Sequence, residues 1–342
     1  MWWMASALGG TLFYYANTEF EIYQIDTRNL AESIFIGVPF DFLSAGMATN
    51  ERELVIEFAE VGAPCQSYFV DLITGRAAFG SYYGYHQFSY SDSHALAYDL
   101  NLHELIAFGW LQSPGAYEFP YLLLGPGPRG AAGAEWDPIH GGFLIVDDQA
   151  DFYRTYNYGA PIFERAEPPE VAPTAPGRAN ASGLGYDQDT KIMWYVTRTH
   201  GIWGLDPFTL DVIAYVPKTS PPSLEGAACL LTDPTPDTPD PELLVTGTCP
   251  GTLYITAVDA TPGGDVTLLS GTRPGSRAAP AGTCAGTAAG LDNPVPRTVL
   301  TANDAGIAAT RIHATRGMCG RLMLQAVDMD SCLATSVRTV PP

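Results

Sequence analysis

A short strand-and-turn motif recurs in this 342-residue chain at multiples of 45 residues. Its copies occupy residues 25–30, 70–75 and 205–210, and the second residue of each copy is an aspartate. Successive copies are separated by 45 and 135 residues, that is, by one and three repeats. A strand-rich repeat of about 40–50 residues is typical of a β-propeller, in which each repeat forms one four-stranded blade. The repeat therefore predicts an all-β fold for about two thirds of the chain.

A second pattern pairs an aromatic residue with an aspartate about five residues before an apolar strand. The pairs are Tyr98-Asp99, Trp136-Asp137 and Tyr186-Asp187. An aspartate in such a turn accepts hydrogen bonds from the backbone, which favours a hairpin between the first two strands of a blade. Five repeats are visible, and a sixth would be divided between the N-terminus and residues 224–231. We therefore predict a propeller of five or six blades.

An acidic, proline-spaced segment at residues 232–242 marks the predicted domain boundary. Alternating aspartate, threonine and proline favour an extended, semi-rigid linker. Residues 1–231 would form the propeller. Residues 243–342 contain about seven short strands with dense turns, a pattern typical of a small immunoglobulin-like β-sandwich.

Two tight turns in the C-terminal domain predict β-hairpins. A Thr-Pro-Gly-Gly turn lies between the strands expected at residues 252–258 and 265–269. An Asn-Asp-Ala-Gly turn lies between those expected at residues 298–301 and 307–312. Turn residues at these spacings favour pairing of the strands that they join.

Four of the six cysteines lie in the C-terminal domain: Cys249, Cys284, Cys319 and Cys332. They lie at strand ends or in loops, and no Cys-x-x-Cys or histidine spacing indicates zinc. Two disulfides are predicted, which implies an oxidising compartment. Three pairings are open, and an up-and-down trace favours Cys249–Cys319 with Cys284–Cys332. Cys65 and Cys229 are expected to be buried thiols, or alternatively to link the second repeat to the last propeller strand.

The charge balance is strongly acidic, with 37 acidic against 17 basic residues and a formal net charge of −20. Such a surface repels nucleic acid, which excludes a phosphate-tracking role. The sequence contains no run of 18 or more apolar residues, so no membrane span is predicted. Residues 1–8 form an apolar start that is very short and lacks a basic region, so no signal peptide is identified. We expect an extracellular or cell-surface protein with an incomplete N-terminus; a leaderless chain is the alternative.

Acidic clusters supply the candidate metal ligands. These candidates for calcium are Asp147, Asp148, Asp151, Asp187 and Asp189. Neither cluster has the alternating oxygens, central glycine and distal glutamate of an EF-hand loop. The alternative is that both clusters are exposed acidic turns, and no other cofactor is expected.

Aromatic residues gather in two segments that the repeat does not explain. They are Tyr82, Tyr83, Tyr85, Tyr153, Tyr156 and Tyr158. Such side chains can stack on sugars or contact a protein partner, but packing between blades needs the same residues. No catalytic residue is identified, because no Gly-x-Ser-x-Gly elbow occurs and the adjacent Asp92, Ser93 and His94 would point to opposite faces of a strand.

The C-terminal domain resembles a module at the ends of secreted proteins of myxobacteria and related bacteria. The resemblance rests on residues 246–251, 260–264 and 284–287, and on the run from Cys319 to Cys332. It implies export and no catalytic residue. The N-terminal domain resembles bacterial YVTN-like and NHL-like propellers in period and turn pattern, best at residues 71–75, and this implies no particular site.

Two classes of function follow from these observations. The first is a secreted or cell-surface binding or scaffold protein, with a propeller recognition face for a protein or carbohydrate ligand and an immunoglobulin-like spacer or attachment module. The second is an extracellular propeller hydrolase, lactonase-like or lyase-like, with an axial active site. The hydrolase would need three or more acidic or histidine side chains converging on the axis.

Overall fold

The computed structural model describes residues 10–16, 21–37, 45–49, 53–58, 66–72, 74, 76–80, 94–99, 104–109, 131–137, 139–147, 152–155, 163–166, 181–197, 201–217, 224–229, 240–278, 284 and 286–342. Regular structure in these residues is β-strand throughout, which confirms the all-β prediction. None of them forms a helix that could cross a membrane. By its contacts the chain divides into a first unit, Met1–Asp211 with Lys218–Asp233, and a second unit, Val212–Pro217 with Pro234–Pro342.

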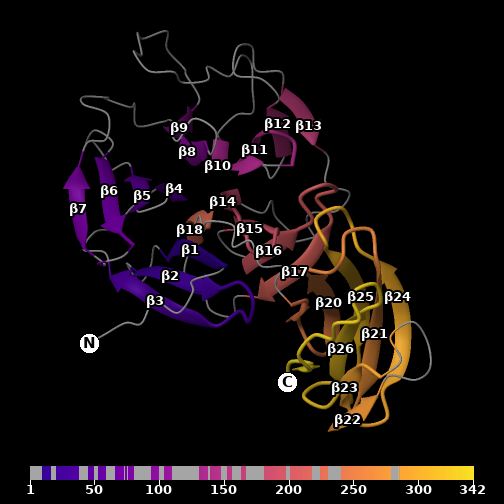
Figure 1. The fold of residues 1–342 in the computed structure, drawn as a ribbon. Helices are drawn as coiled ribbons and strands as arrows, with labels where there is room; N and C mark the ends of the chain where they lie inside the picture. The colour runs from indigo at the N-terminus through magenta and orange to yellow at the C-terminus, as the bar shows by residue number, and fades with distance from the viewer. Residues whose placement is uncertain are drawn as a thin grey trace. The chain divides into compact units, whose positions relative to one another are not determined.

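The strands up to Cys229 form five separate antiparallel sheets (Figure 1). The first contains β18 (Leu224–Cys229), β1 (Thr11–Ala16), β2 (Glu21–Asp26) and β3 (Glu32–Gly37). The second contains β4 (Ala45–Thr49), β5 (Glu53–Phe58), β6 (Gln66–Asp71) and β7 (Ala77–Gly80). The third contains β8 (His94–Asp99) and β9 (Glu104–Gly109). The fourth contains β10 (Ala131–Asp137), β11 (Gly142–Asp147), β12 (Phe152–Thr155) and β13 (Phe163–Ala166), and the fifth contains β14 (Ala181–Tyr186), β15 (Met193–Thr197), β16 (Gly201–Leu205) and β17 (Val212–Pro217).

The aspartates of the repeat close turns, as predicted. Asp26 Oδ1 accepts from Arg28 N at 2.9 Å, and Asp206 Oδ1 accepts from Phe208 N at 2.8 Å. Both aspartates lie between the third and fourth strands of their sheets. A carboxylate that binds the backbone two residues ahead satisfies a donor that the ladder leaves unpaired, which is why aspartate recurs there.

The last strand of the first unit completes the sheet that the N-terminal strands begin. β18 pairs antiparallel with β1, and Cys229 lies opposite Leu12. Residues 224–229 therefore belong to the sheet of the first repeat. The sequence had left open whether they belong to a sixth repeat. The neighbouring first and second sheets share a core that includes Phe13, Ile22 and Leu54.

The first strand of each sheet lies close to the first strands of its neighbours. β10 packs beside β8 and β14, β14 beside β18, and β4 beside both β18 and β8. These strands are rich in alanine and glycine, which brings their backbones together. A Cβ atom added to Gly133 would lie 2.7 Å from Gly183 Cα, and one added to Gly185 would lie 2.9 Å from Cys229 N. Glycine at these positions therefore permits the close approach of the inner strands.

We expect Gly133→Ala to destabilise the first unit by about 1–3 kcal/mol, because the new methyl group would overlap the backbone of Gly183. Gly37→Ala is the matched control, since a Cβ atom there has no neighbour within 4 Å. Urea unfolding of both variants measures the difference. Equal stabilities would show that the inner strands separate without cost.

The second unit contains two antiparallel sheets that share one core. One sheet contains β19 (Glu242–Gly247), β20 (Gly251–Val258) and β25 (Ala308–Ala314). The other contains β24 (Val295–Thr301), β21 (Asp265–Gly271), β26 (Met323–Asp328) and β27 (Arg338–Thr339). Leu253 and Leu268 meet in the core between them, whereas Leu269 packs on the opposite face of its sheet, against the hairpin of β22 (Pro274–Ala278) and β23 (Ala288–Leu291). β17 groups with this unit, where Tyr215 N donates to Thr246 Oγ1 at 2.9 Å.

Both hairpins predicted for the C-terminal domain are wrong. β20 pairs with β19 and β25, and β21 pairs with β24 and β26. The two connections instead cross from one sheet to the other and hold each other in place. Ala260 N donates to Gly306 O at 3.0 Å, and Ala302 N donates to Gly264 O at 2.9 Å. Ala260 and Ala302 are buried in the shared core, so these turns pack against the core that both sheets share.

Two disulfides join Cys249 to Cys319 and Cys284 to Cys332, with Cα–Cα distances of 5.5 and 5.2 Å. The favoured pairing is confirmed, although the up-and-down trace that favoured it is not the observed strand order. Cys229 is a buried thiol, as expected. Cys65 lies outside the described residues.

Candidate functional site

Polar side chains from two distant parts of the first unit meet in a cluster that we call the turn network: Thr27, Arg28, Asp187, Thr190 and Asp189. Thr27 Oγ1 and Thr190 Oγ1 each donate to Asp187 Oδ2 at 2.5 Å. Arg28 donates from Nε and Nη2 to the two oxygens of Asp189, at 2.5 and 2.7 Å. The turn after β2 is thus bound to the turn after β14, 160 residues away in sequence.

Asp187 is the buried centre of the turn network. It is 1% exposed, and Thr27 is fully buried. Burial raises the pKa of Asp187, and the hydrogen bonds from Thr190, Thr27 and Asp189 N offset part of that rise. These donors therefore stabilise the ionised form of the Asp187 carboxyl group, which burial disfavours.

We expect Thr27→Val to destabilise the first unit by about 1–3 kcal/mol, because it removes a buried donor to Asp187. Thr209→Val is the matched control, since Thr209 is exposed and donates to Asp211 on the surface. That change should cost less than about 0.5 kcal/mol. Urea unfolding measures both, and equal losses would contradict a special role for Thr27.

A second cluster surrounds Asp137, at the end of β10. Asp137 Oδ1 accepts from Ile139 N at 3.1 Å, which closes the predicted hairpin turn. Asp137 Oδ2 accepts from His140 Nδ1 at 2.7 Å and Arg154 Nε at 3.4 Å. Arg154 Nη2 also donates to Pro207 O at 2.8 Å, in the turn after β16. As in the turn network, the polar contacts join two sheets. The turn after the first strand of one sheet is bound to the turn between the third and fourth strands of another.

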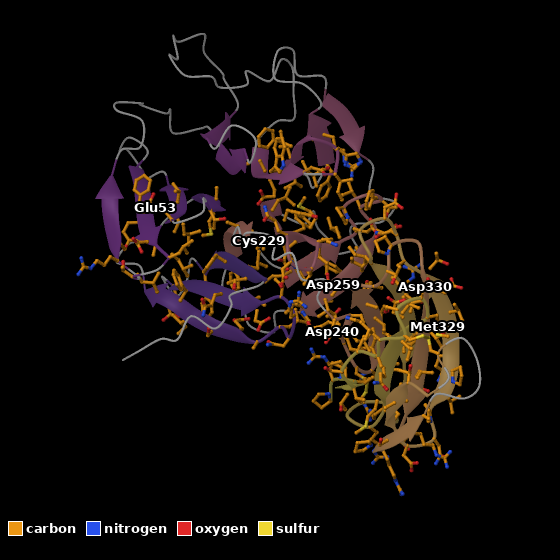
Figure 2. All side chains as sticks on the ribbon, in the orientation of Figure 1. Glu53, Cys229, Asp240, Asp259, Met329 and Asp330 are labelled. Carbon is orange, nitrogen blue, oxygen red and sulfur yellow. A yellow bond between two sulfur atoms is a disulfide. The ribbon has the colours of Figure 1, made fainter. Side chains whose placement is uncertain are left out.

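The inner strands carry a buried acid and a buried thiol. Glu135 on β10 is 8% exposed, and its Oε1 accepts from Trp136 N at 2.8 Å. Burial raises the pKa of Glu135 to about 8, so the side chain is mostly protonated at neutral pH. The thiol is that of Cys229, at the end of β18 (Figure 2). Burial, with Asp187 and Glu135 nearby, also raises the pKa of Cys229. Both groups are therefore neutral at pH 7 and act as hydrogen-bonding and packing groups.

The structure places some of the predicted site residues together. Asp187 and Asp189 lie in the turn network, where protein donors bind their oxygens. Asp147 ends β11, and Asp148 and Asp151 lie outside the described residues. No group of three metal-ligating side chains occurs in the described part of the chain. Calcium binding stays a prediction.

The predicted binding aromatics are divided by the structure. Tyr153 is half-buried in β12, opposite Ile145 of β11 and Arg165 of β13. Tyr82, Tyr83, Tyr85, Tyr156 and Tyr158 lie outside the described residues. Sequence reasoning missed Thr27, Glu135 and Arg154. The alanine- and glycine-rich composition of the first strands was a usable signal for Glu135, because it marks the strands that pack beside the first strands of other sheets.

The chain matches no known protein family, and no curated protein is similar to it in sequence. Among solved structures, TolB from Acinetobacter baumannii is 11% identical, with a TM-score of 0.38 over 65% of this chain and 66% of that one. A structural-genomics protein of unknown function from Bacteroides thetaiotaomicron is 12% identical, with a TM-score of 0.40 over 73% of this chain and 65% of that one. PorZ, a surface component of the type-IX secretion system of Porphyromonas gingivalis, is 11% identical, with a TM-score of 0.30 over 96% of this chain and 43% of that one. This chain thus spans just under two thirds of the length of TolB and of the Bacteroides thetaiotaomicron protein.

Proposed function

We propose that this chain is a secreted or cell-surface binding protein in which a five-bladed propeller recognises a protein or carbohydrate and an immunoglobulin-like sandwich serves as a spacer or attachment module. The observation that carries the proposal is the pair of disulfides in the second unit. Disulfides persist in oxidising compartments, so they support export.

The five sheets formed by the strands up to Cys229 support five blades. Each begins with an alanine- or glycine-rich strand that packs beside two other first strands, in the cyclic order β8, β10, β14, β18 and β4. A sixth blade would have to enter this cycle between two strands that already touch. The pairing of β18 with β1 would close the propeller by joining both ends of the unit in one blade.

One end of these sheets supports recognition better than the other. At the end that bears the Asp187 and Asp137 turns, side chains bind the turns of neighbouring sheets. Tyr156 and Tyr158 follow β12, a third strand, which ends at that same end of its antiparallel sheet. Tyr82, Tyr83 and Tyr85 follow β7, a fourth strand, which runs in the opposite direction. We therefore assign the recognition role to these three tyrosines.

The test is binding of the purified full chain to a glycan array and to intact bacterial cells. The proposal expects saturable binding. The triple variant Tyr82→Ala/Tyr83→Ala/Tyr85→Ala should weaken it by about tenfold or more, since aromatic side chains that a partner covers contribute much of the binding energy. Tyr156→Ala/Tyr158→Ala is the matched control and should bind like the wild type. Absence of binding to both probes, or loss only in the control, would contradict the proposal. We do not propose the hydrolase, because no group of side chains in the described ranges favours it.

A further inference from the structure

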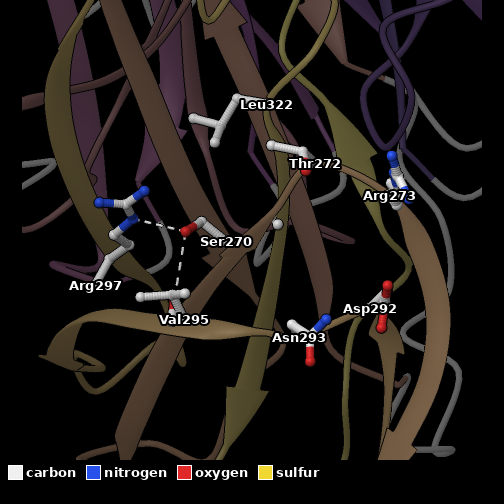
Figure 3. A pocket seen from close by; sticks show the side chains of 9 residues that line it. Ser270, Thr272, Arg273, Asp292, Asn293, Val295, Arg297 and Leu322 are labelled. Atoms are coloured by element: carbon white, nitrogen blue, oxygen red, sulfur yellow. Dashed lines mark hydrogen bonds between the residues drawn. The ribbon is translucent and has the colours of Figure 1, made fainter.

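Two connections in the second unit line a cavity of about 340 Å³ that is open to solvent. The connection from β21 to β22 contributes Arg273, and the connection from β23 to β24 contributes Asp292 and Asn293. Asp292 N donates to Arg273 O at 3.0 Å, so the two connections hold each other in place. Figure 3 shows Arg297, from β24, across the cavity from Arg273.

Arg297 is oriented by a buried hydroxyl group. Its Nε donates to Ser270 Oγ at 2.6 Å, and Ser270 is 1% exposed (Figure 3). The bond uses the guanidinium nitrogen nearest the side-chain stem. The two terminal nitrogens are further donors, in the planar geometry that binds carboxylate, sulfate and phosphate groups.

The charge of this part of the chain does not oppose an anion. Residues 241–342 contain seven arginines and seven carboxylates, so their formal charge is zero and the whole charge of −20 falls on residues 1–240. Two of the seven arginines line this one cavity. An anionic group is therefore attracted locally by these two arginines, and residues 241–342 add no net repulsion.

The other lining groups indicate more than a bare anion. The Asp292 carboxylate can accept from hydroxyl groups, and Asn293 can both donate and accept. Val295, which is 52% exposed, and Leu322 provide apolar surface. The volume lies within the range of about 300–1,000 Å³ typical of small-ligand sites.

We propose that this cavity binds an acidic saccharide, with its carboxylate or sulfate group on Arg297 and its hydroxyl groups on Arg273, Asp292 and Asn293. The apolar C–H face of the sugar ring would lie against Val295. This goes beyond the proposed function, because it gives the second unit a ligand of its own and does not depend on the propeller.

The test is isothermal titration of the full chain with glucuronate, with glucose and with sodium sulfate. We expect saturable binding of glucuronate, and binding at least tenfold weaker for glucose and for sulfate. Arg273→Gln should weaken glucuronate binding by about 10- to 100-fold, the loss expected for a charge-assisted hydrogen bond. Arg277→Gln is the matched control, because Arg277 is an exposed residue of β22 that does not line the cavity.

Three outcomes would overturn the proposal. They are no saturable binding of glucuronate, equal weakening by Arg273→Gln and Arg277→Gln, and equal affinity for sulfate and glucuronate. The last would assign the cavity to free oxyanions. Arg297→Gln with an unchanged unfolding transition provides a second variant, and its glucuronate binding should fall as for Arg273→Gln. The tyrosine variants of the first unit should leave glucuronate binding unchanged, which separates this test from that of the proposed function.

Discussion

Replacing Cys249 and Cys319 by alanine should lower the free energy of unfolding of the second unit by about 4 kcal/mol. The disulfide closes a loop of 70 residues, and closing a loop of this length removes about that much chain entropy from the unfolded state. Cys284→Ala/Cys332→Ala opens a loop of 48 residues and should cost about as much. The two loops overlap in sequence, so the quadruple variant should lose less than the sum.

The two units can be followed separately, because all six tryptophans lie within residues 1–203. Tryptophan fluorescence reports the first unit, and far-ultraviolet circular dichroism also reports the second. In urea, the disulfide variants should shift only the transition that fluorescence does not detect. Cys229→Ala is the control, because Cys229 is a buried thiol of the first unit. An unchanged second transition in the disulfide variants would contradict the prediction and weaken the case for export.

The first unit of the wild type should lose stability between about pH 5 and pH 8, and Glu135→Gln should abolish this loss. Burial raises the pKa of Glu135 from its ordinary value of 4.5 to about 8 in the folded state. Stability from the protonated form is therefore fully present below pH 4.5 and is lost as the pH rises through 8. The slope approaches 1.4 kcal/mol per pH unit, which gives a total loss of roughly 3–5 kcal/mol. Glutamine stays neutral and keeps an oxygen that can accept from Trp136 N.

The measurement is urea unfolding by tryptophan fluorescence at intervals from pH 5 to pH 9, for the wild type and Glu135→Gln. Asp187 also titrates with a raised pKa, so the difference between the two proteins isolates Glu135. The variant should become the more stable protein toward pH 9. Parallel pH profiles would contradict the assignment of a buried, protonated Glu135.

The turns were the most predictable part of the fold. Asp26, Asp137 and Asp206 bind backbone donors two residues ahead, and the sequence signal for such turns is local. The pairing of the second unit's strands was not predictable in this way. Its Thr-Pro-Gly-Gly and Asn-Asp-Ala-Gly turns have hairpin chemistry, but they connect strands of different sheets. The residues of a turn do not determine whether the next strand stays in the same sheet, because that depends on which faces the core must bury.

The candidate sites followed the same division. The aromatic-aspartate pairs located the Asp187 and Asp137 turns, but their partners Thr27 and Arg154 carry no signal that singles them out. The cavity lined by Arg273 and Arg297 was also missed, because β24, which carries Arg297, is brought beside the end of β21 only by the pairing of these two strands.

The 45-residue repeat and the turn aspartates were determined by the sequence alone, because period and short-range hydrogen bonding act within a few residues or within one repeat. Three features were decided only by the tertiary structure: the return of β18 to β1, the contact of Thr27 with Asp187, and the cavity between Arg273 and Arg297. Each joins segments distant in sequence. Such contacts form because strands must satisfy their hydrogen bonds and bury their apolar faces together, and the partner that does so is set by the whole packed unit.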